Sequence, residues 1–354
     1  MEIKDEVSSK IQQFIDENIT EIAHEIVDEQ YAKNPQLFQL YGIEGKKKSL
    51  LDTKHHLSFL ATAIKMDNSQ IFLDYIIWVK NLFNALNIDT KCFLENIVIT
   101  NEVLKKKLND NHLIIQKFVE EALETFPRTT SIGSYINENQ PLAELAKSYL
   151  HFLLNGEREK ASKQVLDAIK NGVDPKLIYL WVFQKTQQEI GQLWQQNKIT
   201  VAQEHYSSAV TQMIMSIVYA SLPPVTKEKP WKIVTASVSG EQHEIGIRMV
   251  SDFFGMEGWK TYYLGANTPT SSIIQTLETI QPNLLALSAT LPPHLKTVED
   301  LIRRVRENEK TCNIKIIVGG YAFSTSNTTA EKVGADFYAK DAIEAIELAN
   351  KFFP

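Results

Sequence analysis

The sequence predicts a multidomain protein in which an all-α part is followed by an α/β part. Three observations support this fold class. The chain has 354 residues, which is more than one compact domain usually contains. Apolar residues recur at helical spacing as far as about residue 222, whereas after Trp231 short β-branched runs alternate with amphipathic helices. Links rich in proline, glycine and hydroxyl or charged residues lie at 126–134 and 223–230, so we expect three domains, at 1–128, 135–224 and 231–354.

Composition and charge exclude several classes of protein. Hydrophobic residues make up 44 % and charged residues 23 %, the balance of an ordinary globular protein. The densest apolar run, residues 177–183, is far shorter than the roughly 18 residues of a membrane-spanning helix. The N-terminus is too acidic for a signal peptide, and the distant cysteines Cys92 and Cys312 give no disulfide framework, so we expect a cytoplasmic protein. Residues 1–128 contain 15 Lys and Arg against 20 Asp and Glu, which argues against nucleic-acid binding.

Residues 1–128 have the pattern of a helical domain. Between residue 5 and about residue 126, no segment alternates as a β-strand does. One helix shows its buried face clearly, because its apolar residues follow one another at steps of three and four: Phe72, Tyr75, Ile76, Val79, Leu82, Phe83 and Leu86. We therefore expect this domain to be built from helices alone.

Residues 135–224 have the pattern of a four-helix bundle. Short polar links separate helical segments that are expected at 141–155, 157–171, 174–194 and 201–221. Thr200 and Gln203 have the spacing of a capping box, in which each side chain accepts a hydrogen bond from the backbone N–H of the other. This spacing predicts that the last helix begins directly after Thr200.

Residues 231–354 have the pattern of a doubly wound parallel sheet. Strands are expected at 233–238, 260–264, 284–287, 314–318 and 336–339, with helices near 244–257, 270–280, 294–310, 327–332 and 341–352. Five strands in about 120 residues fit the flavodoxin-like, Rossmann-type order, in which ligands bind beyond the carboxyl ends of the strands where the winding reverses. We therefore expect the chemistry of this domain just after its first, third and fourth strands.

A histidine follows the first expected strand, in the segment 239–246. The imidazole of His243 would point out of the sheet, and imidazole is a good ligand for transition metals. Glu241 is placed to accept a hydrogen bond from the other ring N–H and so fix the tautomer, and Gly246 would let a bulky group pass close to the backbone. Taken alone the pattern is weak, and a surface histidine in a loop before a helix is the simpler interpretation.

Residues that would line a narrow slot follow the third and fourth expected strands: Ser288, Thr290, Leu291, Val318, Gly319 and Gly320. Together with His243 they resemble the cobalamin-binding domain of methionine synthases, mutases and corrinoid carriers. The resemblance implies that His243 binds cobalt from below in place of the cofactor's dimethylbenzimidazole, the base-off/His-on form. It also implies that Ser288 and Thr290 contact the displaced nucleotide tail and that the two glycines leave room for it. Glu241 stands where that family usually has Asp, which puts its hydrogen bond to His243 in doubt.

A second group of residues lies in the expected bundle. Trp194 stands near the end of the third helix, and Glu204 and His205 lie in the first turns of the fourth. This spacing resembles the light-sensing cobalamin module of the repressors that control carotenoid synthesis. The resemblance implies that Trp194 covers the adenosyl group above the corrin, Glu204 binds its ribose, and His205 ligates cobalt after light breaks the cobalt–carbon bond. The alternative is an ordinary core tryptophan beside a solvated helix start.

An N-terminal helical domain precedes this module, where the repressors carry a DNA-binding domain. The arrangement resembles the photocobilins, in which a globin-like domain holds a bilin close to cobalamin. The resemblance implies a biliverdin site formed by ring-bearing residues of this domain: Tyr41, His55, His56 and Tyr75. For each histidine taken singly, a satisfied core position is the alternative. A thioether from Cys92 is less expected than a non-covalent chromophore, and haem bound through His112 or His56 is a rival.

These resemblances imply a cytoplasmic photoreceptor and not an enzyme. It would bind adenosylcobalamin and biliverdin, with His243 as the dark-state metal ligand and His205 as the ligand after light. Light would also change the assembly of a homo-oligomer, and an unidentified protein would receive the signal, without direct contact to nucleic acid or membrane. The first alternative is a corrinoid carrier of a methyltransferase system, which needs an open face above cobalt. A scaffold that binds neither cofactor is the second.

Overall fold

The computed structural model describes residues 2–108, 111–127, 133–324 and 328–353, and the chain divides into two units, Met1–Thr130 and Ser131–Pro354. The expected connector at 126–134 coincides with this division, and its residues 128–132 lie outside the described part of the chain. Among the described residues, no helix combines the length and the apolar character needed to cross a membrane.

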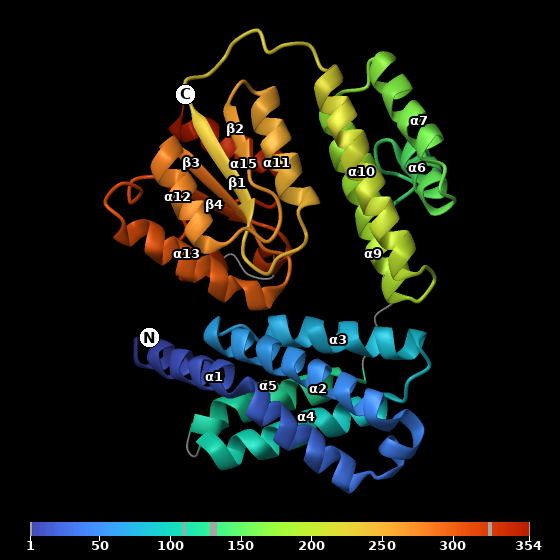
Figure 1. Ribbon diagram of the computed structural model, residues 1–354, viewed down its shortest axis with the longest axis vertical. Helices are drawn as coiled ribbons and strands as arrows, with labels where there is room; N and C mark the ends of the chain where they lie inside the picture. Colours follow the sequence, from blue (N-terminus) through green and yellow to red (C-terminus); the bar gives the residue numbers. More distant parts are fainter. Residues whose placement is uncertain (1, 109–110, 128–132, 325–327, 354) are drawn as a thin grey trace. The chain divides into compact units, whose positions relative to one another are not determined.

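The described secondary structure of the first unit is entirely helical (Figure 1): α1 Glu2–Lys33, α2 Gln36–Lys65, α3 Ser69–Ala85, α4 Thr90–Leu108 and α5 His112–Thr125. α1 packs against α2 and α4, and α3 packs against α2 and α5. The prediction of a helical N-terminal domain is thereby confirmed. A globin-like arrangement of these helices stays a prediction.

The helix α3 shows how the sequence positions one of these elements. Asn68 caps its start, since the Asn68 side chain accepts a hydrogen bond from the backbone N–H of Gln70 at 3.1 Å. The predicted apolar face is buried at four positions: Phe72, Tyr75, Ile76 and Val79. Leu86 is 42 % exposed, because the helix ends at Ala85 and the chain turns away at Asn87, whose φ is +55°.

The second unit begins with helical rods: α6 Ala143–Leu154, α7 Arg158–Lys170, the continuous run of α8 Pro175–Leu177, η2 Ile178–Gln184 and α9 Lys185–Gln195, and finally α10 Val201–Ser221. The sequence predicts one helical segment at 174–194, but within this run η2 is seven residues of π-helix. Its buried apolar side chains all face the core: Ile178, Tyr179, Val182 and Phe183. The capping box is confirmed, because the side chains of Thr200 and Gln203 each accept a hydrogen bond from the other's backbone N–H.

A five-stranded parallel sheet completes the second unit: β1 Lys232–Ser237, β2 Lys260–Tyr263, β3 Leu284–Ser288, β4 Lys315–Gly319 and β5 Phe337–Tyr338. The strand order β2-β1-β3-β4-β5 is the predicted flavodoxin-like order. The connecting helices are α11 Ile245–Met256, α12 Thr270–Ile280, α13 Leu295–Glu307, α14 Thr328–Lys332 and α15 Ala342–Phe352. α11 packs against α15, and α12 packs against α13, so the helices form two separate layers (Figure 1). Residue 327, the expected start of α14, lies outside the described residues.

The helices α6 to α10 and the α/β domain share one buried core within the second unit. The same apolar cluster contains Tyr179 and Phe183 of η2 and Phe253 of α11. Polar contacts also cross between the two parts, since the hydroxyl of Tyr179 donates to Oδ2 of Asp252 at 2.9 Å. The helices that carry Trp194, Glu204 and His205 are therefore joined directly to the domain that carries His243.

Candidate functional site

Three strand ends meet at the carboxyl edge of the sheet. Ser237 at the end of β1 lies opposite Ser288 of β3, and Ser288 in turn lies opposite Gly319 of β4. The loop that follows β1 carries Glu241 and His243. The segments that the sequence singled out after the first, third and fourth strands are therefore neighbours, as their parallel order requires.

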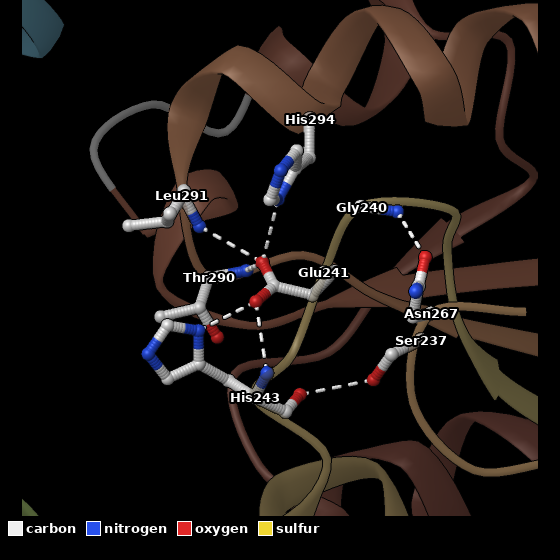
Figure 2. Close-up of polar contacts among 8 residues, drawn as sticks. All are labelled: Ser237, Gly240, Glu241, His243, Asn267, Thr290, Leu291 and His294. Atoms are coloured by element: carbon white, nitrogen blue, oxygen red, sulfur yellow. Dashed lines mark hydrogen bonds and ion pairs between the residues drawn. The ribbon is translucent and has the colours of Figure 1, made fainter. Parts of the chain in front are cut away.

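Glu241 is the centre of this edge (Figure 2), and its side chain is 0 % exposed. Its Oε1 accepts hydrogen bonds from the backbone N–H of His243 at 3.0 Å and from Nδ1 of the same residue at 2.5 Å. Its Oε2 accepts from the backbone N–H groups of Thr290 at 2.7 Å and Leu291 at 3.1 Å. A further bond to Oε2 comes from Nδ1 of His294 at 2.9 Å. The glutamate therefore keeps the hydrogen bond to His243 that its extra methylene had put in doubt.

The electrostatics of this network fix the tautomer of His243. Burial alone would raise the pKa of Glu241, but the hydrogen bonds from His243, His294 and the backbone outweigh it and hold that pKa well below its usual range. The ionised carboxylate accepts hydrogen bonds only, so Nδ1 of His243 is the donor and Nε2 is the nitrogen left to bind a metal. The pKa of His243 is raised by the hydrogen bond to Glu241, against burial, and by the charges of Glu241 and Glu204.

The ring of His243 stands at the surface while its support is buried. The His243 side chain is 58 % exposed, in contrast to the buried carboxylate behind it. The hydroxyl of Ser237 donates to the carbonyl oxygen of His243 at 2.9 Å and so fixes the backbone of the loop as well. An imidazole that is held on one nitrogen and exposed on the other has the form of a preorganised metal ligand.

His294 belongs to the same network, although sequence reasoning did not single it out. It is the last residue of the short 3-10 helix η3, Pro292–His294, and its side chain is 19 % exposed. Gly240 lies beside it with a φ of +87°, and a Cβ at that position would be 3.2 Å from Nε2 of His294. The sequence signal for this residue is the pair Pro292-Pro293, which starts the turn that brings His294 back over the strand ends.

Glycines at the edge of the sheet have two different environments. A Cβ on Gly320 would lie 2.4 Å from the carbonyl oxygen of Ala289, and one on Gly319 would lie 2.8 Å from that of Ala339. The packing of the strand ends alone therefore requires both glycines. A Cβ on Gly246 would meet nothing within 4 Å apart from its chain neighbours and the backbone of its own helix, and a role for Gly246 toward a ligand stays a prediction.

The other residues expected to line the slot differ in how far they are buried. Ser288 is buried and Val318 is fully buried, whereas Leu291 is 41 % exposed. Thr290 and Leu291 act in this structure through their backbone N–H groups, which both bind Glu241. Contacts of Ser288 and Thr290 with a nucleotide tail stay predictions.

The start of α10 holds the second group of predicted residues. Oε2 of Glu204 pairs with Nδ1 of His205 at 2.5 Å, and Oε1 accepts a hydrogen bond from the hydroxyl of Ser208 at 2.9 Å. The His205 side chain is 74 % exposed and that of Glu204 is 28 % exposed. Trp194, one residue before the end of α9, packs partly buried against the core. The charge of Glu204 makes the smallest of the contributions that raise the pKa of His243.

The four residues predicted to hold a bilin are divided between the interior and the surface of the first unit. His56 and Tyr75 are buried and joined, with the Tyr75 hydroxyl 2.6 Å from Nδ1 of His56. Burial lowers the pKa of His56 to about 3, so this ring is neutral, as in a satisfied core histidine. Tyr41 is 43 % exposed and His55 is also exposed. Their roles toward a bilin stay predictions.

Cys92 and His112 are the remaining residues of the first unit that the sequence offers to a chromophore or a haem. The thiol of Cys92 donates to the carbonyl oxygen of Asp89 at 2.8 Å, and burial raises its pKa, which lowers its reactivity. His112, the alternative haem ligand, begins α5, where its Nε2 lies 3.2 Å from Oε1 of Gln116.

Comparison with known proteins points to one cofactor. Residues 231–347 match a family described as B12 binding domain, and residues 145–219 match a second family with the same description. The chain is 24 % identical to dimethylamine corrinoid protein 3 of Methanosarcina acetivorans over 205 residues. This alignment covers 57 % of the chain and 95 % of the relative. A corrinoid protein of Desulfitobacterium hafniense is 31 % identical over 124 residues, which covers 35 % of this chain and 56 % of that protein.

The solved structure of the monomethylamine corrinoid protein of Methanosarcina barkeri has the same fold. It superposes with a TM-score of 0.53 at 21 % identity and covers 60 % of this chain and 99 % of its own. The prediction of cobalamin binding is confirmed, while the photocobilin resemblance, light sensing and the bilin stay predictions. Residues 145–219 and 231–347 are therefore similar to two families that share the description B12 binding domain.

Proposed function

We propose that the second unit binds cobalamin in the base-off/His-on form, with Nε2 of His243 as the lower axial ligand. The observation that supports this most strongly is the Glu241 network. A buried carboxylate occupies Nδ1 of His243 and leaves Nε2 at the surface, at the edge of a flavodoxin-like sheet where ligands bind. The fit of the remaining edge supports it too, because Gly246 leaves open space at the start of α11.

In this proposal the residues of the chain hold and orient the cofactor. Cobalamin, when bound, supplies a cobalt–carbon bond that a nucleophile or light can break. Glu241 keeps His243 in the tautomer that presents Nε2 and increases the basicity of that nitrogen through the Nδ1–H bond. Because these hydrogen bonds hold the loop through its backbone and its side chains, little ordering of the ligand loop is needed on binding.

We propose methyl-group carriage as the function of the bound cobalamin. The relatives support this role, since they are named as corrinoid proteins of dimethylamine and monomethylamine systems. In such a carrier the second unit would present its cofactor to methyltransferase partners. The exposure of His205, 74 % of its side chain, leaves the start of α10 accessible to a partner protein.

Light sensing with adenosylcobalamin is the second candidate, and the start of α10 favours it. Glu204 and His205 form a hydrogen-bonded pair, and the charge of Glu204 contributes to the raised pKa of His243. In this candidate the imidazole of His205 would serve as a second cobalt ligand after light. In a carrier the same imidazole would obstruct methyl transfer. The proposed photocobilin-like bilin site, with biliverdin in the first unit, and a light-dependent homo-oligomer belong to this candidate.

One experiment separates the candidates. The full chain is loaded in the dark with adenosylcobalamin or methylcobalamin, its visible spectrum is recorded, and the measurement is repeated after green light and after addition of a thiol methyl acceptor. Transfer of the methyl group, with no stable product that requires His205, supports the carrier. A stable bis-imidazole spectrum after light, absent in His205→Ala, supports the sensor and contradicts the carrier. Failure of the wild-type chain to bind either form contradicts both.

A further inference from the structure

The hydroxyl of Tyr179 has two acceptors beside it and one proton to donate. Tyr179 is the second residue of the π-helix η2, and it is 0 % exposed. Its hydroxyl oxygen lies 2.9 Å from Oδ2 of Asp252 on α11 and 3.3 Å from the carbonyl oxygen of Met215 on α10. A carbonyl and an ionised carboxylate only accept hydrogen bonds, so the hydroxyl can bond to one of them at a time. While Asp252 is ionised, one of the two acceptors therefore lacks the proton of Tyr179.

A proton on the carboxyl group of Asp252 resolves this competition. The carboxyl O–H would donate to the oxygen of Tyr179, and the hydroxyl of Tyr179 would then donate to the carbonyl of Met215. The three groups would form one continuous line from α11 through η2 to α10. The phenol itself keeps its proton, because burial and the charge of Asp252 hold the pKa of Tyr179 above its usual range. The number of hydrogen bonds in this line therefore depends on the protonation of Asp252.

The surroundings of Asp252 bring its protonation into the range of mildly acidic pH. The side chain is 14 % exposed, and burial raises its pKa to about 6, against the hydrogen bond from Tyr179 and the charge of Arg248. Arg248 is a weak counterion, since its Nε is 4.0 Å from Oδ2 and its guanidinium donates to a hydroxyl of α10 instead. The other titratable groups on which the charge of Asp252 acts are two phenols, Tyr219 of α10 and Tyr263 of β2, whose pKa values burial raises.

The line joins the two parts of the second unit. η2 and α10 belong to the helical part, α11 belongs to the α/β domain that carries His243, and α10 packs against α11 (Figure 1). π-helical turns such as η2 are frequent at functional sites. We propose that Tyr179 and Asp252 form a proton-dependent latch, which joins the helical part to the α/β domain more tightly when Asp252 is protonated. The latch needs no cobalamin to operate, so it can be measured in the cofactor-free chain.

Asp252→Asn tests the latch, because the amide NH₂ group donates to Tyr179 at every pH, as the protonated carboxyl does. The unfolding constant of the full chain is measured by urea titration at about pH 7.5 and about pH 5. We expect the variant to be more stable than wild type at the higher pH, where the buried carboxylate is ionised. Because folding raises the pKa of Asp252 from 3.8 to about 6, the ratio of the wild-type unfolding constant to that of the variant should fall about 10-fold toward the lower pH.

A control and a second readout separate the latch from a purely structural role. Asp167→Asn, at an exposed aspartate of α7, is the matched control and should follow wild type at both pH values. Hydrogen exchange of peptides from η2, α10 and α11, corrected for the intrinsic effect of pH, should be slower at the lower pH in wild type and equal at both in Asp252→Asn. An Asp252→Asn variant that is destabilised by the same factor at both pH values would overturn the latch.

Tyr179→Phe decides the question if the Asn variant does not fold. This change removes the hydrogen bond that lowers the pKa of Asp252, so that pKa should rise further. The free energy of unfolding should then keep the sign of its pH dependence and move its midpoint to higher pH. A midpoint at the wild-type value, or a loss of the pH dependence, would contradict the latch.

Discussion

Replacing Glu241 by Gln removes the charge at the centre of the site and changes almost nothing in shape. In the structure the carboxylate accepts hydrogen bonds from two donors of His243, from two backbone N–H groups after β3, and from His294. An amide has only one acceptor oxygen, and its NH₂ group would take the place of the other carboxylate oxygen. That NH₂ group would then face N–H donors and could not accept their hydrogen bonds. At least one buried donor would be left without an acceptor.

The cost follows from burial and charge. The Glu241 side chain is 0 % exposed, so water cannot replace the lost acceptor. Removing one partner from a buried charged contact typically costs about 3–5 kcal/mol. We therefore expect Glu241→Gln to lower the free energy of unfolding of the second unit by about 3–5 kcal/mol, a large part of the roughly 5–15 kcal/mol that is typical of domains.

Urea unfolding without cofactor, followed by tryptophan fluorescence, measures this effect, because Trp181, Trp194, Trp231 and Trp259 lie in the second unit. Glu347→Gln, at an exposed glutamate of α15, is the matched control and should stay within about 0.5 kcal/mol of wild type. A Glu241→Gln variant within about 1 kcal/mol of wild type would refute the argument that the carboxylate holds the two loops together.

Four further predictions concern other parts of the chain. The folded pKa of His56, about 3, lies below its ordinary value, so the unfolded chain binds more protons at acidic pH. The free energy of unfolding of the first unit should therefore fall by about 2 kcal/mol between about pH 6.5 and pH 5. Pulse proteolysis that follows cleavage in α2 and α3 measures it, and His56→Leu should remove this part of the pH dependence. Gly320→Ala should destabilise the chain by about 2 kcal/mol or more in thermal unfolding, since its Cβ would meet Ala289 and its φ is +96°. Gly246→Ala should leave the stability of the cofactor-free protein unchanged and weaken cobalamin binding in titrations. If the variant binds cobalamin as tightly as the wild type, the cofactor does not need the open space at Gly246. His205→Ala should still bind adenosylcobalamin in the dark, and formation of the wild-type light product in its spectrum would exclude His205 as a cobalt ligand.

The architecture of the second unit could be predicted from local signals. Apolar runs separated by turn residues located every strand, and the parallel order then brought the ends of β1, β3 and β4 together. The capping box at Thr200 fixed the start of α10. The π-helix η2 could not be predicted, because its sequence, Ile178–Gln184, is as apolar and periodic as an ordinary buried helix.

The candidate site could be predicted only in part. His243 and Glu241 follow the first strand directly, so their place at the carboxyl edge is a consequence of the fold. His294 comes near them only through the turn at Pro292, and its bond to Glu241 spans 53 positions of the chain. The backbone N–H groups of Thr290 and Leu291 carry no sequence signal at all, because every residue except proline has one.

The measurement that tests the central claim most directly is the electron paramagnetic resonance spectrum of cob(II)alamin bound to protein labelled with nitrogen-15 histidine. If Nε2 of His243 ligates cobalt, the axial nitrogen splitting changes from the pattern of nitrogen-14 to that of nitrogen-15. The splitting then persists in His205→Ala and disappears in His243→Ala. A nitrogen-14 pattern from labelled protein would show that the cofactor keeps its own base, and it would contradict the account.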